Sequence, residues 1–173
     1  MPVTINGTTG ISGAPLQRGT ETATTSGTTV VVATGIPDWV NRVTVTLSGV
    51  SLSGTSMPLI QFGTGSTPTY VTSGYVSSSD NYTSTPGPSA SSTAGFRIGS
   101  SSAATTLWYV NYIFTTVGAN KWVGGAVMAT ASGAGVGFSA GGVTLSGPLT
   151  AIRLNTVNGT DTFDAGSVNY IYE

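Results

Sequence analysis

The sequence predicts an all-β protein, a jelly-roll-like two-sheet β-sandwich with a short extended N-terminal arm. No stretch of the chain repeats apolar residues at the i, i+3, i+4, i+7 spacing of an amphipathic helix. Thr, Val and Gly dominate, and all three are poor helix formers. Short β-branched and aromatic runs recur along the chain between Gly- and Pro-containing turns, which is the pattern of an all-β sandwich.

Residues 1–20 are predicted to form the arm, and residues 21–173 the sandwich. Residues 3–13 alternate apolar with small polar side chains and predict a short strand and turn, followed by a loop over 14–19. Two interpretations stay open, a frayed terminus or an arm that adds a strand to a neighbouring protein. In the second, the anchoring side chains are the apolar ones of the arm, namely Val3, Ile5 and Ile11.

The first strands of the body are predicted at residues 28–34 and 42–48. In the second run, Val43, Val45 and Leu47 alternate with polar residues, which is typical of a strand with one buried face and one wet face. Shorter strand patterns follow at 59–62 and 75–78.

Residues 77–93 consist mostly of Ser, Thr, Asn and Pro and show no apolar period. Two prolines within such a polar stretch predict an exposed loop. Because loops of this length are uncommon in compact domains and often carry function, we expect this segment to face outward.

The second half of the chain continues the strand pattern. The run at 106–115 is apolar on both faces, so we expect a central strand, or a strand whose outer face meets another subunit. About nine or ten strands are expected in all. The remaining predicted strands of this half are 94–98, 121–130, 143–145, 151–156 and 167–172.

Charge is scarce: the 173 residues include 5 Lys and Arg, 6 Asp and Glu, no His and no Cys, with a formal net charge of −1. Nucleic-acid binding needs clustered cations, and the basic residues here are widely spread. The absence of Cys removes disulfides and thiolate metal sites. A net charge this close to zero gives little electrostatic solubility and favours association.

The titratable side chains offer little for catalysis. Without His, a Ser–His pair cannot be built, and Lys121, which could act as the base of a Ser–Lys pair, lies in a hairpin signal. Asp161 and Asp164 are the only close pair of acids. They fit a turn capped by side chains best, with a weak calcium site or a catalytic pair as alternatives. We therefore expect no enzyme activity, no metal site and no cofactor.

Glycan binding requires exposed aromatic rings beside amides and hydroxyls. Tyr82 is the best candidate because its surroundings are small and polar, and Tyr75 and Asn81 are further candidates for contacting a receptor or glycan. The alternative is that the tyrosine anchors its own loop.

Two segments, residues 35–56 and 154–173, together resemble a recurrent domain of bacteriophage and prophage virion proteins, often found at the C-terminus of tail fibres and other surface proteins. The opening residues 3–13 also look like the N-terminus of such proteins. The resemblance implies a structural protein of the virion, assembled in the cytoplasm of a host bacterium, and no catalytic residues. The chain differs from long fibres in lacking an extended shaft.

We therefore expect a tail-associated fibre or adhesin-like subunit that attaches to the particle by its arm and binds rather than catalyses. The expected partners are further copies of the chain in a homo-oligomer, a trimer, together with other virion proteins of the tail, adaptor or capsid, and host surface polysaccharide. Membrane insertion is not expected, because no run of about 18 apolar residues exists. A capsid decoration or head-fibre protein, and a lectin-like host-glycan binder, stay open as alternatives.

Overall fold

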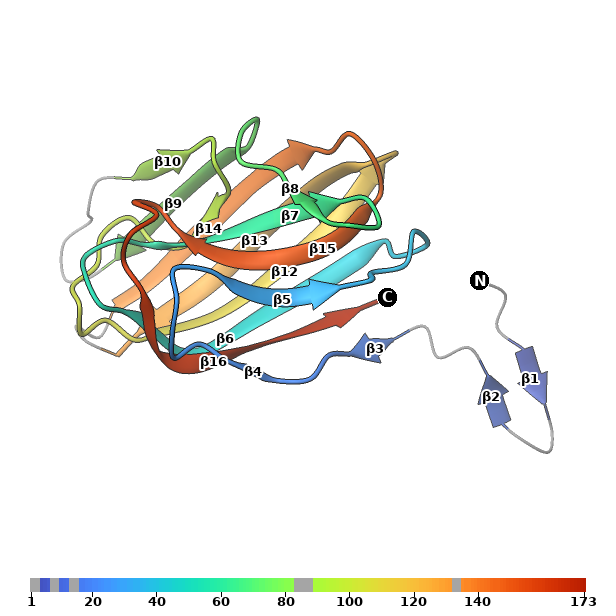
Figure 1. The fold of residues 1–173 in the computed structure, drawn as a ribbon, viewed down its shortest axis with the longest axis horizontal. Helices are drawn as coiled ribbons and strands as arrows, with labels where there is room; N and C mark the ends of the chain where they lie inside the picture. The colour runs from blue at the N-terminus through green and yellow to red at the C-terminus, as the bar shows by residue number, and fades with distance from the viewer. Residues whose placement is uncertain (1–3, 7–9, 13–15, 83–88, 132–134) are drawn as a thin grey trace.

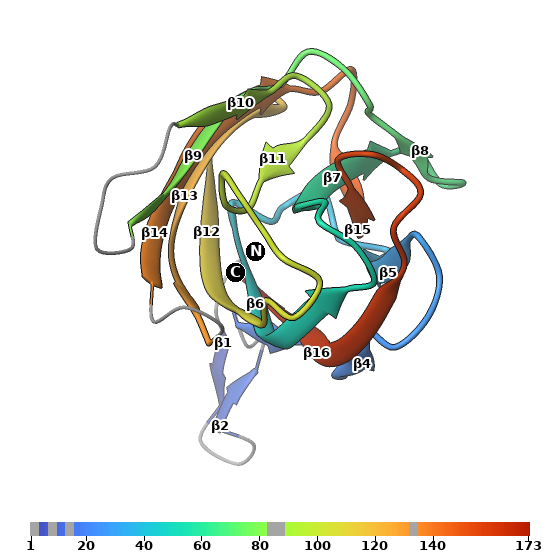
Figure 2. The same ribbon diagram turned by 90° about the vertical axis from the view of Figure 1, so that its left-hand side faces the viewer.

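The structure, a computed structural model, describes residues 4–6, 10–12, 16–82, 89–131 and 135–173. Within these residues it contains sixteen strands and no helix. Two antiparallel sheets face each other (Figures 1 and 2), and Figure 2 shows the larger, curved sheet on the left and the smaller on the right. The predicted two-sheet β-sandwich is confirmed, and the predicted number of strands was too low because several strands are only two or three residues long.

The large sheet has the order β10-β9-β14-β13-β12-β6-β16-β3, and β4 also pairs with β16. The predicted central strand at 106–115 corresponds to β12, which lies between β13 and β6. The strands of this sheet are β3 (Gln17–Arg18), β4 (Thr22–Ala23), β6 (Arg42–Leu52), β9 (Val76–Tyr82), β10 (Ala90–Ser92), β12 (Trp108–Gly118), β13 (Lys121–Thr130), β14 (Gly135–Thr144) and β16 (Phe163–Tyr172).

The small sheet has the order β11-β7-β15-β5, and β8 pairs with β7. The chain passes from one sheet to the other eight times, among them between β5 and β6, β6 and β7, β14 and β15, and β15 and β16, and this alternation is jelly-roll-like. The consecutive strands β12, β13 and β14 instead form a meander within the large sheet. The strands of the small sheet are β5 (Val30–Thr34), β7 (Pro58–Thr64), β8 (Thr69–Tyr70), β11 (Phe96–Arg97) and β15 (Leu149–Thr156).

The N-terminal segment contains a hairpin of β1 (Thr4–Asn6) and β2 (Gly10–Ser12), in which Ile5 pairs with Ile11. Val3 lies outside the described residues. Within the segment predicted as an arm, β3 pairs with β16, and the N–H of Gly19 donates to the carbonyl of Tyr170 at 2.8 Å. The large sheet therefore already includes residues that the sequence pattern had assigned to a loop.

Alternation of side chains explains the core. Val43, Val45 and Leu47 of β6 are buried, as predicted, and so are the alternate residues of β12 from Trp108 to Phe114. The inward aromatic rings pack closely because strands on both sheets contribute them. Phe62 lies 5.3 Å from Phe96 and 4.9 Å from Phe114, measured between ring centroids.

The predicted exposed loop at 77–93 is wrong at both of its described ends, which form β9 and β10. Ser77 and Ser79 are buried, and their hydroxyls are paired. Ser77 Oγ accepts from the N–H of Arg97 at 2.9 Å, and Ser79 Oγ donates to the carbonyl of Gly99 at 2.7 Å. A buried hydroxyl costs little when it is hydrogen-bonded, so a serine-rich run can occupy a strand between β10 and β14.

Candidate functional site

The outer face of the large sheet, formed by the outward side chains of β12, β13 and β14, is the first candidate site. We use "outer face" for these residues throughout. Val127, Val136 and Phe138 are 62%, 53% and 53% exposed. The outer face comprises Tyr109, Asn111, Ile113 and Thr115 of β12, Val123, Val127 and Ala129 of β13, and Val136, Phe138 and Ala140 of β14.

The pairing register joins these side chains into one surface. Phe138 lies opposite Val127, and Val127 opposite Asn111; one rung away, Val136 lies opposite Ala129 and Ala129 opposite Tyr109. Side chains directly opposite on one face of a sheet are close enough to touch. The exposed apolar groups are therefore contiguous rather than scattered, and contiguous exposed patches mark interaction sites.

None of the residues listed for the outer face is charged. Charged side chains border these residues: Asp80 of β9 lies opposite Phe138, Lys121 is the exposed first residue of β13, and Arg42 of β6 lies opposite Thr115. Arg42 pairs with Glu173 in an exposed ion pair of 2.9 Å. The apolar surface is thus bordered by charge but does not contain any.

Two hollows shape the outer face. One, of about 460 Å³, lies along Tyr109, Ala129 and Val136, and the other, of about 380 Å³, lies between Ile113 and Phe138. Gly125 lines the second hollow, and its missing side chain helps to create it. The exposed Val127 lines both hollows, so the surface offers projecting side chains and recesses for them.

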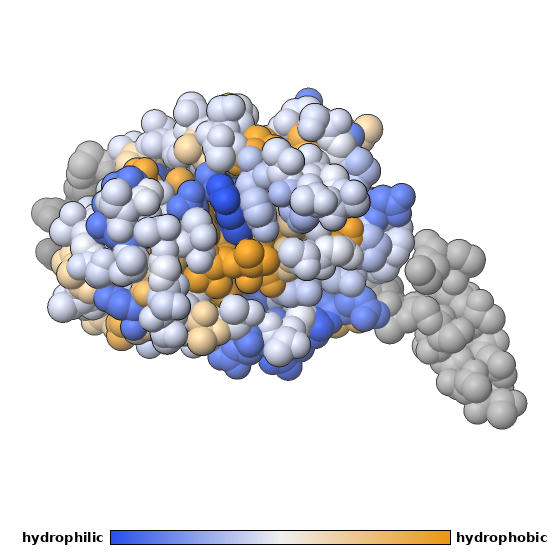
Figure 3. Space-filling view, viewed as in Figure 1, coloured by the Kyte–Doolittle hydropathy of each residue, from blue (hydrophilic) through white to orange (hydrophobic). Residues whose placement is uncertain are grey.

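The outward side of the small sheet has a different chemistry. Arg153 Nε donates to Gln61 Oε1 at 2.8 Å, and the guanidinium lies 4.3 Å from the centre of the Tyr70 ring. Asn155 donates to the same Gln61 oxygen at 3.3 Å. On the side seen in Figure 3 most of the surface is pale or blue, and orange gathers mainly near its middle. The polar groups here are already paired within the chain.

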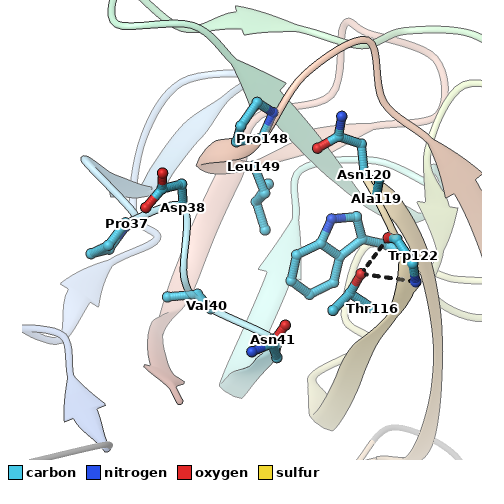
Figure 4. Close-up of a pocket in the computed structure, with 11 residues that line it drawn as sticks. Pro37, Asp38, Val40, Asn41, Thr116, Ala119, Asn120, Trp122, Pro148 and Leu149 are labelled. Carbon is cyan, nitrogen blue, oxygen red and sulfur yellow. Dashed lines mark hydrogen bonds between the residues drawn. The ribbon is translucent and has the colours of Figure 1, made fainter. Parts of the chain in front are cut away.

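A pocket at one end of the sandwich is the second candidate site, and we call it the end pocket (Figure 4). Its volume is about 450 Å³. Three connections surround it: the segment after β5, the turn between β12 and β13, and the segment before β15. Its lining residues are Pro37, Asp38, Val40, Asn41, Thr116, Gly118, Ala119, Asn120, Trp122, Pro148 and Leu149.

The floor of the end pocket is apolar and its rim is polar. Val40, Trp122 and Leu149 are buried, whereas Asp38 and Asn41 are exposed. Asn120 has a φ of 58°, a left-handed conformation that asparagine tolerates well, and this turn conformation holds it at the rim. The Thr116 hydroxyl donates to the carbonyl of Gly118 at 2.8 Å and so fixes the same turn.

The structure separates the three predicted glycan-contact residues. Tyr82 is 42% exposed, and its ring lies 6.1 Å from that of Phe138, so it extends the apolar surface of the outer face. Asn81 donates from its side chain to the carbonyl of Ser101 at 2.8 Å and accepts from the N–H of Ser100 at 3.3 Å. The prediction for Tyr75 was wrong: it is 1% exposed and its ring packs against Phe96, so it cannot meet a ligand at the surface.

Of the acidic pair, Asp161 lies in the turn that the sequence predicts, whereas Asp164 belongs to strand β16. Asn158 Oδ1 accepts from the backbone N–H groups of Thr160 and Asp161, at 3.1 and 3.0 Å. Asp161 Oδ2 accepts from the N–H of Ser56 at 2.9 Å, and Ser51 donates to Asp164. Hydrogen bonds from Asn158 and from Ser56 hold the pKa of Asp161 below its usual value.

Two further kinds of site, a Ser–Lys pair at Lys121 and a metal site, were looked for in the described part of the chain. Lys121 lies opposite Thr144 in the register of β13 and β14, not opposite a serine. No cluster of three or more His, Cys, Asp or Glu side chains that could hold a metal ion occurs among the described residues. In the same residues, no helix has the length and hydrophobicity that crossing a membrane requires.

Comparisons with known proteins give no match, whether with protein-family models, with curated proteins or with solved structures. The resemblance to virion proteins therefore stays a prediction from the sequence.

The outer face of β13 and β14 was not singled out in the sequence, although the alternation of Val123, Val127 and Phe138 with inward residues is a signal of it. The end pocket has no local signal, because its walls come from three separate segments.

Proposed function

We propose that this chain is a structural subunit of a bacteriophage virion, a tail-associated fibre or adhesin-like subunit, which binds rather than catalyses and self-associates through the outer face. The observation that carries the proposal is the uncharged, contiguous apolar surface on β12, β13 and β14. The resemblance of residues 35–56 and 154–173 to virion proteins supports the assignment to a particle.

The outer face together with its polar border is large enough for a stable interface. The five adjacent strands β9, β14, β13, β12 and β6 carry the outer face and its border. At a strand spacing of about 4.8 Å and about 3.4 Å per residue, eight residues of five strands cover roughly 650 Å² before side chains add relief. A standard specific interface buries about 800 Å² per partner, so a second protein covering this sheet would bury an area of that order.

A second copy of the chain is the partner that we propose for this surface. A charged partner would find no complementary charge on the outer face, whereas an identical surface matches it in being neutral and apolar. Copies with a net charge of −1 repel each other weakly. The projecting Val127 and the hollows beside it lie on the same surface, so one copy can supply side chains for the recesses of another.

Solution mass tests this association. Light scattering or mass photometry is expected to give a homo-oligomer, with a trimer at three times the 17.3 kDa mass of the chain. Val127→Asp places a charge in the middle of the outer face and is expected to produce monomers. Val31→Asp is the matched control, because Val31 is 52% exposed on the small sheet and its replacement leaves the outer face unchanged.

The outcomes separate the parts of the proposal. A wild-type monomer at high concentration would refute self-association, and a dimer would refute the trimer. If Val31→Asp disrupts the oligomer as strongly as Val127→Asp while both stay folded, the interface does not lie on the outer face.

Position on the particle needs a second experiment. A cryo-EM map of particles that carry the protein is expected to show it at the tail or its adaptor. Density spread over the capsid lattice would instead favour the alternative, a decoration or head-fibre protein, and absence from purified particles would refute a virion role.

A further inference from the structure

We propose that the end pocket is a binding site for a neutral saccharide. The proposal concerns a different surface from the outer face and does not rest on self-association. It is carried by an apolar floor, an indole N–H that opens onto the pocket, and polar side chains on the rim that have no partner among the described residues.

Trp122 is the central observation. The residue is only 3% exposed, and its indole N–H donates to none of the described residues, yet this nitrogen is not among the buried unpaired atoms and so reaches the surface of the pocket. Figure 4 shows the ring projecting into the space between Asn120 on one side and Val40 on the other. A tryptophan N–H that opens onto a pocket without a partner in the chain is available to an external acceptor.

The rim adds acceptors and donors of the kinds that hydroxyl groups use. The carboxylate of Asp38 has no hydrogen bond or ion pair with any described residue, and the side-chain amide of Asn120 is unpaired in the same part of the chain. A carboxylate accepts hydrogen bonds only, whereas an amide both donates and accepts. A sugar hydroxyl can donate a hydrogen bond to Asp38, and it can either donate a hydrogen bond to the side-chain amide of Asn120 or accept one from it.

The charge of the pocket selects among polar ligands. Asp38 is the only charged side chain that lines it, and no Lys or Arg does. Anionic ligands such as phosphate or a uronic acid would meet a like charge without a counter-charge, so they are disfavoured. A neutral polyol gives the carboxylate hydrogen-bond donors without requiring it to be neutralised.

The floor and the size complete the match. The buried Val40, Leu149 and Trp122 present only their outermost atoms at the floor of the pocket, where the C–H groups of a pyranose ring can contact them. A volume of about 450 Å³ lies within the range of small-ligand sites, which combine apolar walls with a few placed polar groups. Because the pocket is open and the contacts are few, we expect a dissociation constant on the order of 1 mM.

Nuclear magnetic resonance of the full chain provides a direct test. The three tryptophans give three indole N–H cross-peaks, and Trp122→Phe identifies the one that belongs to Trp122. The probes are the methyl glycosides of glucose, galactose, mannose and N-acetylglucosamine, titrated one at a time. At least one is expected to shift the Trp122 peak in a saturable way. The peak of Trp108, a core residue at the start of β12 that does not line the pocket, should stay unchanged.

Two rim variants tie the binding to the pocket. Asp38→Asn keeps the shape and removes the charge, and Asn120→Gly removes the amide while allowing the positive φ. Each is expected to weaken binding by about three- to tenfold, the worth of one hydrogen bond. Glu21→Gln is the control, since it removes one exposed carboxylate that does not line the pocket and should leave the affinity unchanged.

The following results would overturn the proposal. No shift of the Trp122 peak with any of the four glycosides would do so, and so would equal affinity in Asp38→Asn, Asn120→Gly and wild type. A response to methylammonium chloride without any response to the glycosides would make the pocket a cation site instead. If Trp122→Phe does not fold, backbone assignment identifies the peak and the two rim variants still decide the question.

Discussion

The hydroxyl oxygen of Tyr75 accepts a hydrogen bond from the backbone N–H of Phe62 across 2.8 Å, deep inside the sandwich. Phe62 belongs to β7, whose edge is paired with the short strands β11 and β8 on either side of this position. The carbonyl of Phe62 accepts from the N–H of Val71 at 2.9 Å. A side chain thus completes the pairing of a strand where neither neighbouring strand reaches.

Removing that hydroxyl is expected to weaken the fold. In Tyr75→Phe the ring remains but the buried N–H of Phe62 loses its acceptor, which costs about 1–3 kcal/mol in the free energy of unfolding. Urea denaturation followed by fluorescence measures the difference. Tyr82→Phe is the matched control, since Tyr82 is 42% exposed and its hydroxyl can bond to water, so a change within about 0.5 kcal/mol is expected. Equal losses in both variants would show that the bond to Phe62 contributes nothing specific.

Alkaline pH is expected to destabilise the protein through two buried tyrosines. Burial raises the pKa of Tyr75 and of Tyr112 to about 12, from a usual 10.0, against smaller lowering effects of their hydrogen bonds. The folded state therefore holds these protons more tightly than the unfolded state. Their contribution is complete below pH 10 and falls as the pH rises through 12, by about 1.4 kcal/mol per pH unit for each group.

Unfolding free energies measured at about pH 8 and about pH 11 test the sign and size of this effect. Tyr112→Phe removes one of the two groups, so its stability should fall less steeply with pH than that of the wild type. Its hydroxyl partner, Ser139, keeps a bond to the carbonyl of Arg97, which limits the cost of the substitution itself. A variant that declines as steeply as the wild type would exclude Tyr112 as a source of the pH dependence.

The elements predicted most reliably were strands that bury one face in the apolar core and expose the other to water. The alternation of Val43, Val45 and Leu47 can be recognised locally, because burying one apolar face is favourable whichever strands form the rest of the core. The same holds for the two-faced run that became β12. The run that became β12 lies inside the large sheet, as expected, and β6 is its neighbour there.

Elements that depend on distant partners were predicted poorly. Ser79 is compatible with a strand only because Gly99 supplies an acceptor, and Tyr75 is buried only because Phe62 supplies a donor. Neither partner can be read from the local pattern, which is dominated by polar side chains. The end pocket shows the same limit, since Asp38, Asn120 and Leu149 meet there only once both sheets have formed.

The N-terminal arm leads to a prediction in which the point of truncation decides the result. Deletion of residues 2–15 leaves β3 in place, with its pairing to β16, so the free energy of unfolding should change by less than about 0.5 kcal/mol. Deletion of residues 2–20 also removes Gly19, which lies against the ring of Tyr170 so closely that a side chain would not fit. Loss of these contacts and of the backbone bonds should cost about 1–2 kcal/mol.

Incorporation into particles distinguishes an anchor from a frayed terminus. If residues such as Ile5 and Ile11 dock the chain to other virion proteins, the deletion of residues 2–15 should abolish incorporation while the sandwich remains as stable as the full chain. Quantitative mass spectrometry of purified particles measures the copy number, with the full-length protein as reference. Normal incorporation of the shorter deletion would show that attachment uses the sandwich itself, and a loss seen only with the longer deletion would assign it to stability and not to the hairpin of β1 and β2.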